Sequence, residues 1–283
     1  MTPAELARAM HGVIEPVHAI LYFAAEVQER YAVMGLEPRG QGYIAGRAAP
    51  MGPVGPEVAA ATFYNFNPLL FQQALPATWS VASPDDLLTA RAAGIEAVYE
   101  RVDAPTDGLE EATELAGRAV AACSFEGRPL AAANAGVELP GTPFADLFQR
   151  VTMLREYRGD GHIAALVGEG VGAVEALVLY TGWQDRVSQR FLQKSRFWDD
   201  EAWGAAVAAL QARALHDGDG LTDAGRALRE EIEQRTDQLA SRPWAALGEE
   251  DSLRLWDLLA PLAAALNEGE AYPRPYPLPS RPG

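Results

Sequence analysis

The stretch AVAALQARALHDGDGLTDAGRALREEIEQRTDQL, residues 206–239, decides the fold of the last third of the chain. Its first part, with the residues just before it, predicts a helix over 202–215. A tight turn rich in glycine and aspartate follows at 216–220, and a long helix then runs to about Leu239. The pattern therefore predicts two helices separated by a short hairpin.

Helices are also expected on either side of this stretch, over 186–197 and about 249–266. The whole order resembles the winged helix of MarR-type regulators, in which LTDAGR (221–226) follows the wing. LGEEDSLRLWDLLAPL (247–262) resembles their terminal dimerisation helix. The resemblance covers about 186–266. It implies a recognition helix, a short two-stranded wing and a homodimer.

The whole chain also resembles an actinobacterial family known only as helix-turn-helix proteins. Four segments carry this resemblance: EPVHAILYFAAE (15–26), GYIAGRAAPMGPVGP (42–56), TFYNFNP (62–68) and LREYRGDGHIAALV (154–167). It implies a fold and no particular activity.

The composition predicts a globular protein, and the helical spacing along the chain predicts that it is mainly α. The 283 residues are 48% hydrophobic and 22% charged, which excludes a disordered chain and allows two domains or one large one. We expect a helical small-molecule-binding domain over 1–182, a degenerate winged-helix domain over 183–267 and a proline-rich tail over 268–283. The tail is expected to be extended or disordered.

Within the first domain, helical spacing predicts a helix from Pro3, with a kink or a new helix at Pro16. The Gly- and Pro-rich segment 35–56 contains apolar residues and predicts a packed connection, and 59–71 returns to helix. Two glycines around residue 160 predict a turn, followed by a short helix over 161–168.

The charge argues against nucleic acid as a partner. Lys and Arg total 23 against 39 Asp and Glu, a net charge of −16. Between residues 196 and 225 there are two basic and six acidic side chains, where a DNA-binding surface needs cations. We expect a scaffold that no longer binds DNA; the alternative is a ligand-responsive MarR-like regulator.

Other classes are excluded by what the sequence lacks. A single cysteine, Cys123, excludes an internal disulfide. No apolar run approaches the roughly 18 residues of a membrane span, and the N-terminus has no hydrophobic centre. We therefore expect no membrane partner and a cytoplasmic location. The absence of Gly-x-Gly-x-x-Gly and Walker motifs predicts no nucleotide cofactor.

His162 is the first candidate for chemistry. The predicted turn holds Asp160 and places this imidazole at the positive end of a helix, which favours its neutral form. It would then serve as a base, a hydrogen-bond donor or a metal ligand. The alternative is that Asp160 only caps the helix and His162 packs beside it.

Glu15 and His18 lie three residues apart on one helix face. With His162 they would form a set of two histidines and one carboxylate, compatible with iron or zinc. A hydrogen-bonded Glu–His pair lining a ligand pocket, or a surface pair, are the alternatives. The three residues are also the candidates for acid–base catalysis, and whether the chain is an enzyme stays open.

The remaining candidates would bind a small-molecule ligand. An arginine in the glycine-rich connection suits a carboxylate or a phosphate, although a salt bridge to a helix explains it equally well. An asparagine in a buried helix needs a partner, and aromatic residues suit a pocket wall or a core. The predicted ligand-binding residues are Tyr22, Arg47, Tyr64, Asn65, Arg155 and Asp160.

Overall fold

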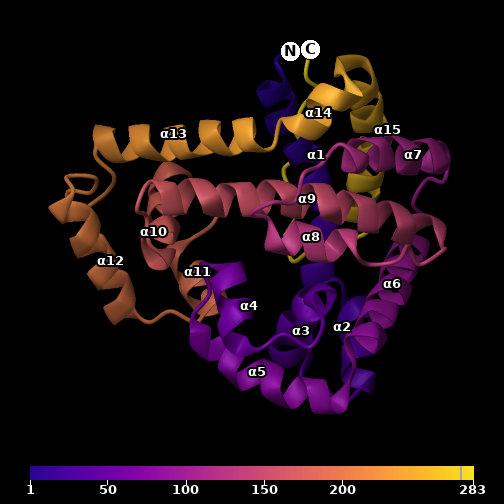
Figure 1. Cartoon of the computed structure of the whole chain (residues 1–283), viewed down its shortest axis with the longest axis horizontal. Coiled ribbons are helices and arrows are strands. Elements are labelled where there is room, and N and C mark those ends of the chain that lie inside the picture. Colours follow the sequence, from indigo (N-terminus) through magenta and orange to yellow (C-terminus); the bar gives the residue numbers. More distant parts are fainter. Residues whose placement is uncertain (275) are drawn as a thin grey trace.

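The computed structural model describes residues 1–274 and 276–283, without the side chains of Pro38 and Arg39, and is built from helices (Figure 1). The α-helices are α1 (Pro3–Phe23), α2 (Ala25–Val33), α3 (Tyr43–Ala48), α4 (Pro56–Phe63), α5 (Pro68–Val81), α6 (Pro84–Arg101), α7 (Leu109–Ala121), α8 (Pro129–Ala135), α9 (Pro143–Gly168), α10 (Ala173–Trp183), α11 (Gln189–Arg196), α12 (Asp200–Ala212), α13 (Asp223–Leu239), α14 (Arg242–Leu247) and α15 (Glu249–Glu268). A π-helical turn, η1 (Pro38–Gly42), precedes α3, and a 3-10 turn, η2 (Ala49–Met51), follows it. The mainly α class is confirmed.

Local sequence sets several helix starts. The hydroxyl of Thr2 accepts a hydrogen bond from the backbone N–H of Glu5 at 3.3 Å, and the Glu5 carboxylate accepts one from the N–H of Thr2 at 2.7 Å. Ser83 and Asp86 form the same reciprocal capping box at the start of α6. These caps satisfy backbone donors that the first turn leaves without partners.

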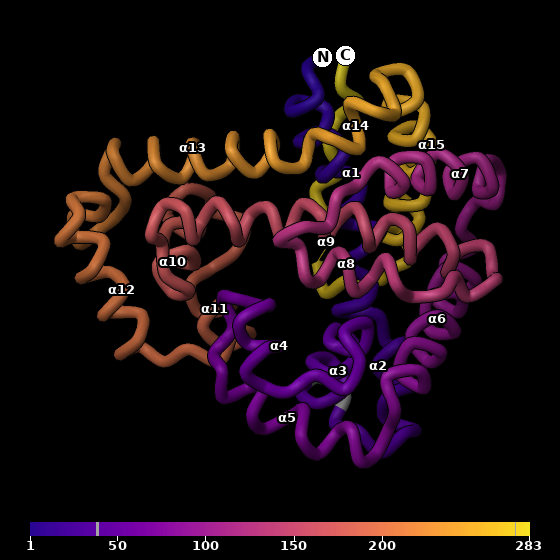
Figure 2. The backbone as a smooth tube through the Cα atoms, in the orientation of Figure 1, coloured from indigo at the N-terminus to yellow at the C-terminus, as the bar shows by residue number. Residues whose placement is uncertain are grey.

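The buried apolar residues form two clusters. The large core takes residues from α1 to the first half of α9 and from α14 and α15, whereas the small core takes the end of α9 and α10–α13. In Figure 2, α9 crosses the molecule and α13 lies alongside it, and the two helices are in contact. α14 and α15 contribute to the large core although they follow the small one in sequence, and the expected domain boundaries stay a prediction.

Helix α9 belongs to both cores. Its residues Phe148 and Leu154 are buried in the large core, and Ala165 and Leu166 in the small one. The turns between these two pairs carry mostly polar residues. The polar middle of α9 therefore lies where the two cores meet.

The predicted two-stranded wing is wrong. Among the described residues the only β pairing is one isolated antiparallel bridge between His216 and Leu221. The carboxylate of Asp217 accepts hydrogen bonds from the N–H groups of Asp219 and Gly220, each at 2.9 Å, which closes the turn immediately. α12 ends at Ala212 and Thr222 already caps α13, so few residues are left on either side of the turn for a ladder, and the region is a helix–turn–helix without a winged sheet.

Gly225 lets the start of α13 pack closely on the residues that follow α12. A Cβ atom at this position would lie 2.0 Å from the backbone oxygen of Leu215. Only glycine permits this approach of α13 to the end of α12. The hydroxyl of Thr222 caps α13 by accepting a hydrogen bond from the Gly225 N–H at 3.1 Å.

No new helix starts at Pro16, because α1 continues past this residue and ends at Phe23, whereas the expected kink stays a prediction. The predicted single helix over 59–71 is wrong, since it is divided at residues 64–67 between α4 and α5. The backbone of Tyr64 is in the left-handed region, with φ 53°, which ends α4. Figure 1 shows α4 and α5 as separate helices joined by this bend.

The C-terminal segment is packed on the body of the protein. Asn267 of α15 exchanges two hydrogen bonds with the backbone of Tyr276 at 2.8 and 2.9 Å, and Arg281 forms a paired salt bridge with Asp257. The hydroxyl of Tyr272 donates to the backbone oxygen of Pro16.

In the part of the chain that the structure describes, no single helix has the length and apolar composition to cross a membrane. α9 and α10 meet those criteria only when taken together, and they are bent by 104° at the break between them.

Candidate ligand-binding site

Five of the predicted site residues converge where the two cores meet, together with one that the sequence did not single out. They come from α1, α3 and α9, three elements far apart in sequence. We call this cluster the seam site; its residues are Glu15, His18, Tyr22, Arg47, Arg155 and Glu156.

His18 is the most deeply buried member, with no exposed surface. Its Nδ1 lies 3.1 Å from Oγ1 of Thr152, and its Nε2 lies 2.7 Å from the hydroxyl of Tyr22. Burial lowers the pKa of His18 to about 3, and the charge of Arg155 acts in the same direction. The imidazole is therefore neutral at pH 7, and because both ring nitrogens are occupied, it positions Tyr22 rather than meeting a ligand itself.

Two carboxylates balance part of the positive charge. Arg155 donates from Nε to Glu15 at 3.1 Å and from Nη1 to Glu156 at 2.9 Å. Burial alone would raise the pKa of both carboxyl groups, but the arginines outweigh it; the pKa of Glu15 falls to about 2 and that of Glu156 lies below its ordinary value. Both groups are ionised at neutral pH.

The other contacts of Glu156 are longer. Its Oε1 lies 3.7 Å from Nη2 of Arg47 and 3.7 Å from Nε2 of His18. Both distances exceed a normal hydrogen bond. The carboxylate thus attracts Arg47 without binding it closely.

Arg47 is held in a box of aromatic rings. Its guanidinium carbon lies between 4.5 and 5.8 Å from four ring centroids, those of Tyr22, Tyr43, Phe63 and Phe66. Its Nη1 donates to the hydroxyl of Tyr43 at 3.3 Å. Cation–π contacts of this kind hold a guanidinium in place without neutralising its charge.

The two glycines of the GYIAG segment, Gly42 and Gly46, allow the close packing that brings Arg47 into the aromatic box. A Cβ atom on Gly46 would lie 2.3 Å from the hydroxyl of Tyr31, and one on Gly42 would lie 2.9 Å from the Cβ of Tyr31. The absence of side chains lets α3 pack directly on α2. This close approach turns the predicted packed connection into a wall of the seam site.

Sequence reasoning did not assign Glu156, Thr152 or Tyr43 to the site. Thr152 and Glu156 are four residues apart on α9, and Tyr43 is four residues before Arg47, so each pair shares a helix face. This spacing of four residues could have indicated that these side chains lie beside the predicted site residues. The aromatic side chains Phe63 and Phe66 were expected in a core, and they are buried.

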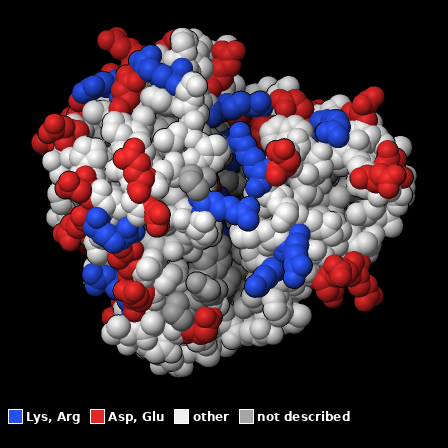
Figure 3. Space-filling view, turned by 180° about the vertical axis from the view of Figure 1, so that it is seen from behind, with Lys and Arg blue, Asp and Glu red and all other residues white. Residues whose placement is uncertain are grey.

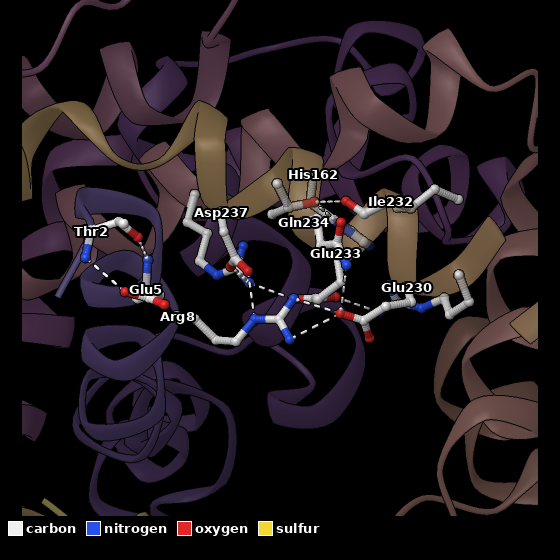
Figure 4. Close-up of polar contacts among 12 residues, drawn as sticks. Thr2, Glu5, Arg8, His162, Glu230, Ile232, Glu233, Gln234 and Asp237 are labelled. Atoms are coloured by element: carbon white, nitrogen blue, oxygen red, sulfur yellow. Dashed lines mark hydrogen bonds and ion pairs between the residues drawn. The ribbon is translucent and has the colours of Figure 1, made fainter. Parts of the chain in front are cut away.

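His162 lies apart from the seam site. It is ten residues beyond Thr152 on the continuous helix α9, roughly 15 Å along the axis. Its Nδ1 lies 2.9 Å from the hydroxyl of Thr236, which donates to the backbone oxygen of Ile232 at 2.7 Å (Figure 4). The hydroxyl must therefore accept from His162, so the proton is on Nδ1. Burial, with the charge of Arg229, lowers the pKa of His162 to about 4.

The predicted turn around Asp160 is wrong, because α9 continues through it. Asp160 is buried and its carboxylate accepts a hydrogen bond from the backbone N–H of Ala131 at 2.9 Å, so it caps α8 from a neighbouring helix. Gly161 serves a close approach, since a Cβ atom there would lie 2.8 Å from Nη1 of Arg128. Burial raises the pKa of Asp160 to about 6.

Tyr64 and Asn65 join the two cores outside the seam site. The hydroxyl of Tyr64 donates to the backbone oxygen of Val171, and the backbone oxygen of Asn65 accepts from the indole N–H of Trp198 at 2.9 Å. These contacts connect the bend after α4 with the small core.

A second set of charged residues fixes α13 to α1 and α9. Arg8 of α1 bonds Asp237 at 2.5 Å and Glu230 at 3.1 Å, as Figure 4 shows, and Arg158 of α9 bonds Asp237 at 2.8 Å. His11 is partly buried beside this network and lines a cavity of 10 Å³. These pairs hold the small core against the large one.

The expected metal set does not form. In residues 1–274 and 276–283 there is no group of three His, Cys, Asp or Glu side chains placed to hold a metal ion. Glu15 and His18 belong to the seam site, and His162 contacts α13 instead.

The chain matches a helix-turn-helix family over residues 7–273. This chain belongs to that family. No curated protein and no solved structure matches the chain.

In this helix-turn-helix protein, α12 is the helix expected to face DNA. Its exposed residues include Asp200, Glu201, Gly204, Ala205 and Ala208, and no cation is among them. Figure 3 shows acidic side chains gathered at that end of the molecule, on the right of the view, while Lys and Arg side chains gather around a hollow near the middle of the face. The basic side chains of this face are thus not on the helix that would need them.

Proposed function

We propose that the chain binds a small organic molecule at the seam site and that α12 has lost the ability to bind DNA. The observation that carries the proposal is the incomplete pairing of Arg47 and Glu156 at 3.7 Å inside an aromatic box. A buried ion pair repays its desolvation only when its geometry is close and its remaining hydrogen bonds are made. A ligand with polar groups would complete this pairing.

Access to solvent supports the same reading. The side chains of Glu15 and Arg155 are 23% and 22% exposed, whereas that of Glu156 is 6% exposed. The seam site therefore runs from the surface to a buried carboxylate.

A second candidate function is a ligand-responsive DNA-binding regulator. The family match favours it, because helix-turn-helix proteins include many such regulators. The position of the site would suit it as well, since α9 joins both cores and a ligand there would act on the helices of the small core. The acidic surface of α12 argues against it.

Two measurements test the proposal. Native mass spectrometry of the protein purified from the cells that make it is expected to reveal a bound molecule of small mass, and it also reports the subunit count, which tests the expected homodimer. A gel-shift titration at two salt concentrations with the DNA upstream of its own coding sequence is expected to show no specific complex. Tight, sequence-specific binding would instead establish the regulator.

A further inference from the structure

Arg196, at the end of α11, faces the seam site from the side of the small core. Its guanidinium carbon lies 4.2 Å from the ring centroid of Phe66, and that of Arg47 lies 5.7 Å from the same ring. A guanidinium group from the side of the large core and one from the side of the small core therefore lie near the same aromatic ring.

Arg196 has no acidic partner among the ion pairs of the described residues. Its Nη1 makes one long hydrogen bond, of 3.4 Å, to the hydroxyl of Ser195, and its Nε is buried with no acceptor. A buried N–H of a charged group that lacks an acceptor destabilises the folded state. The residue is therefore poorly explained as a structural element alone.

The charges around Arg196 are unbalanced. Burial lowers the pKa of Arg196, the nearby hydroxyl of Tyr43 opposes this, and the charge of Arg47 lowers it further. A guanidinium nevertheless stays protonated at neutral pH. With Arg155, three guanidinium groups face the two carboxylates of the seam site, and the neutral His18 adds no charge. Among the side chains that the structure describes, one positive charge of this group is left without a counterpart.

Resting on the function proposed above, we propose that Arg196 and Arg47 together hold the oxyanion group of the ligand, either the carboxylate of a small organic acid or a free phosphate. A planar guanidinium binds such groups through two parallel hydrogen bonds. The Nε of Arg196 would gain its acceptor, and the surplus charge would be neutralised. Phe66 and Tyr43 would contact a flat apolar body next to the carboxylate.

The test is thermal unfolding of the full chain with three probes: benzoate, its uncharged analogue benzamide, and inorganic phosphate, each at about 10 mM. An oxyanion present at about one hundred times its Kd raises the Tm by roughly 5 °C, whereas benzamide leaves it unchanged. If benzoate raises the Tm more than phosphate does, the ligand carries a carboxylate. If phosphate raises the Tm more, the ligand is free phosphate.

Arg196→Met gives the decisive comparison, with Arg190→Met, an exposed position on the same helix, as the matched control. Methionine keeps the contact with Phe66 and removes both the charge and the unpaired N–H. Without anion, Arg196→Met is expected to unfold at or above the Tm of the wild type. With anion, the Tm of Arg196→Met is expected not to rise, whereas that of Arg190→Met rises as in the wild type.

Several results would overturn the inference: no response to either anion, an equal response to benzamide, or an unchanged anion response in Arg196→Met. A lower Tm of unliganded Arg196→Met together with a normal anion response would assign Arg196 a purely structural role. If mass spectrometry detects a bound neutral or cationic molecule while neither anion acts, the proposed function stands and this inference fails.

Discussion

Glu156→Gln is the variant that probes the seam site most sharply. The substitution keeps the size of the side chain and removes its charge, which leaves Arg47 without an acid within 4.0 Å and weakens the 2.9 Å bond to Arg155. Removing one partner of a buried ion pair costs about 3–5 kcal/mol. Because glutamine retains a hydrogen-bond acceptor, we expect the lower end, about 3 kcal/mol, or roughly 8 °C in Tm for a chain of this size.

Urea and thermal unfolding followed by circular dichroism measure this loss, and Glu114→Gln, an exposed position on α7, is the control. The pKa of Glu156 is lowered in the folded state, so its contribution is present above the ordinary glutamate pKa and is lost as the pH falls through the lower, folded value. The difference in the free energy of unfolding between wild type and Glu156→Gln should therefore become smaller below about pH 4. A Glu156→Gln variant as stable as Glu114→Gln at pH 7 would refute the reasoning.

Three further outcomes are expected. Gly46→Ala should destabilise the protein by about 1–3 kcal/mol in urea unfolding, because the new Cβ would lie 2.3 Å from the hydroxyl of Tyr31. Adding Tyr31→Phe should recover part of the lost stability. If it recovers none, the clash is not with this hydroxyl. Burial raises the pKa of Asp160 to about 6, so ionising its carboxyl removes stability as the pH rises from about 4 through 6. Asp160→Asn should thus be more stable than wild type at pH 7.5, and a difference independent of pH would contradict this. Tyr272→Phe removes the hydrogen bond to Pro16 and should cost about 1 kcal/mol, whereas no change would mean that the tail is not anchored there.

The helical architecture could largely be predicted because local signals set it. Caps such as Thr2 and Ser83 and the apolar spacing between them act over a few residues, and the structure agrees with them. The LTDAGR segment likewise predicted the start of α13. The predicted wing was wrong because only the resemblance implied it; α12 ends and α13 begins too close to the turn to leave residues for a ladder.

The errors around residue 160 have a tertiary cause. Two glycines next to an aspartate are typical of a turn. Here, however, Gly161 gives room to Arg128 and Asp160 caps α8, contacts that come from segments about 30 residues away. Periodicity within one segment carries no information about such neighbours.

The composition of the seam site was only partly predictable. Glu15, His18 and Tyr22 share one helix face, so their grouping followed from spacing alone. Arg47 was recognised as a charge in a packed glycine-rich segment, but its aromatic box takes rings from α1, α3 and the end of α4, which come together only in the fold. Arg196 was missed because its neighbours come from the large core.

Equilibrium dialysis against a small-molecule extract of the cells that make the protein, read by mass spectrometry, tests the central claim most directly. Wild-type protein and Arg190→Met should retain the same small molecule. Arg47→Met, checked for folding by circular dichroism, should retain little of it. Equal retention by all three proteins, or retention by none, would contradict the assignment of the seam site as a ligand-binding site.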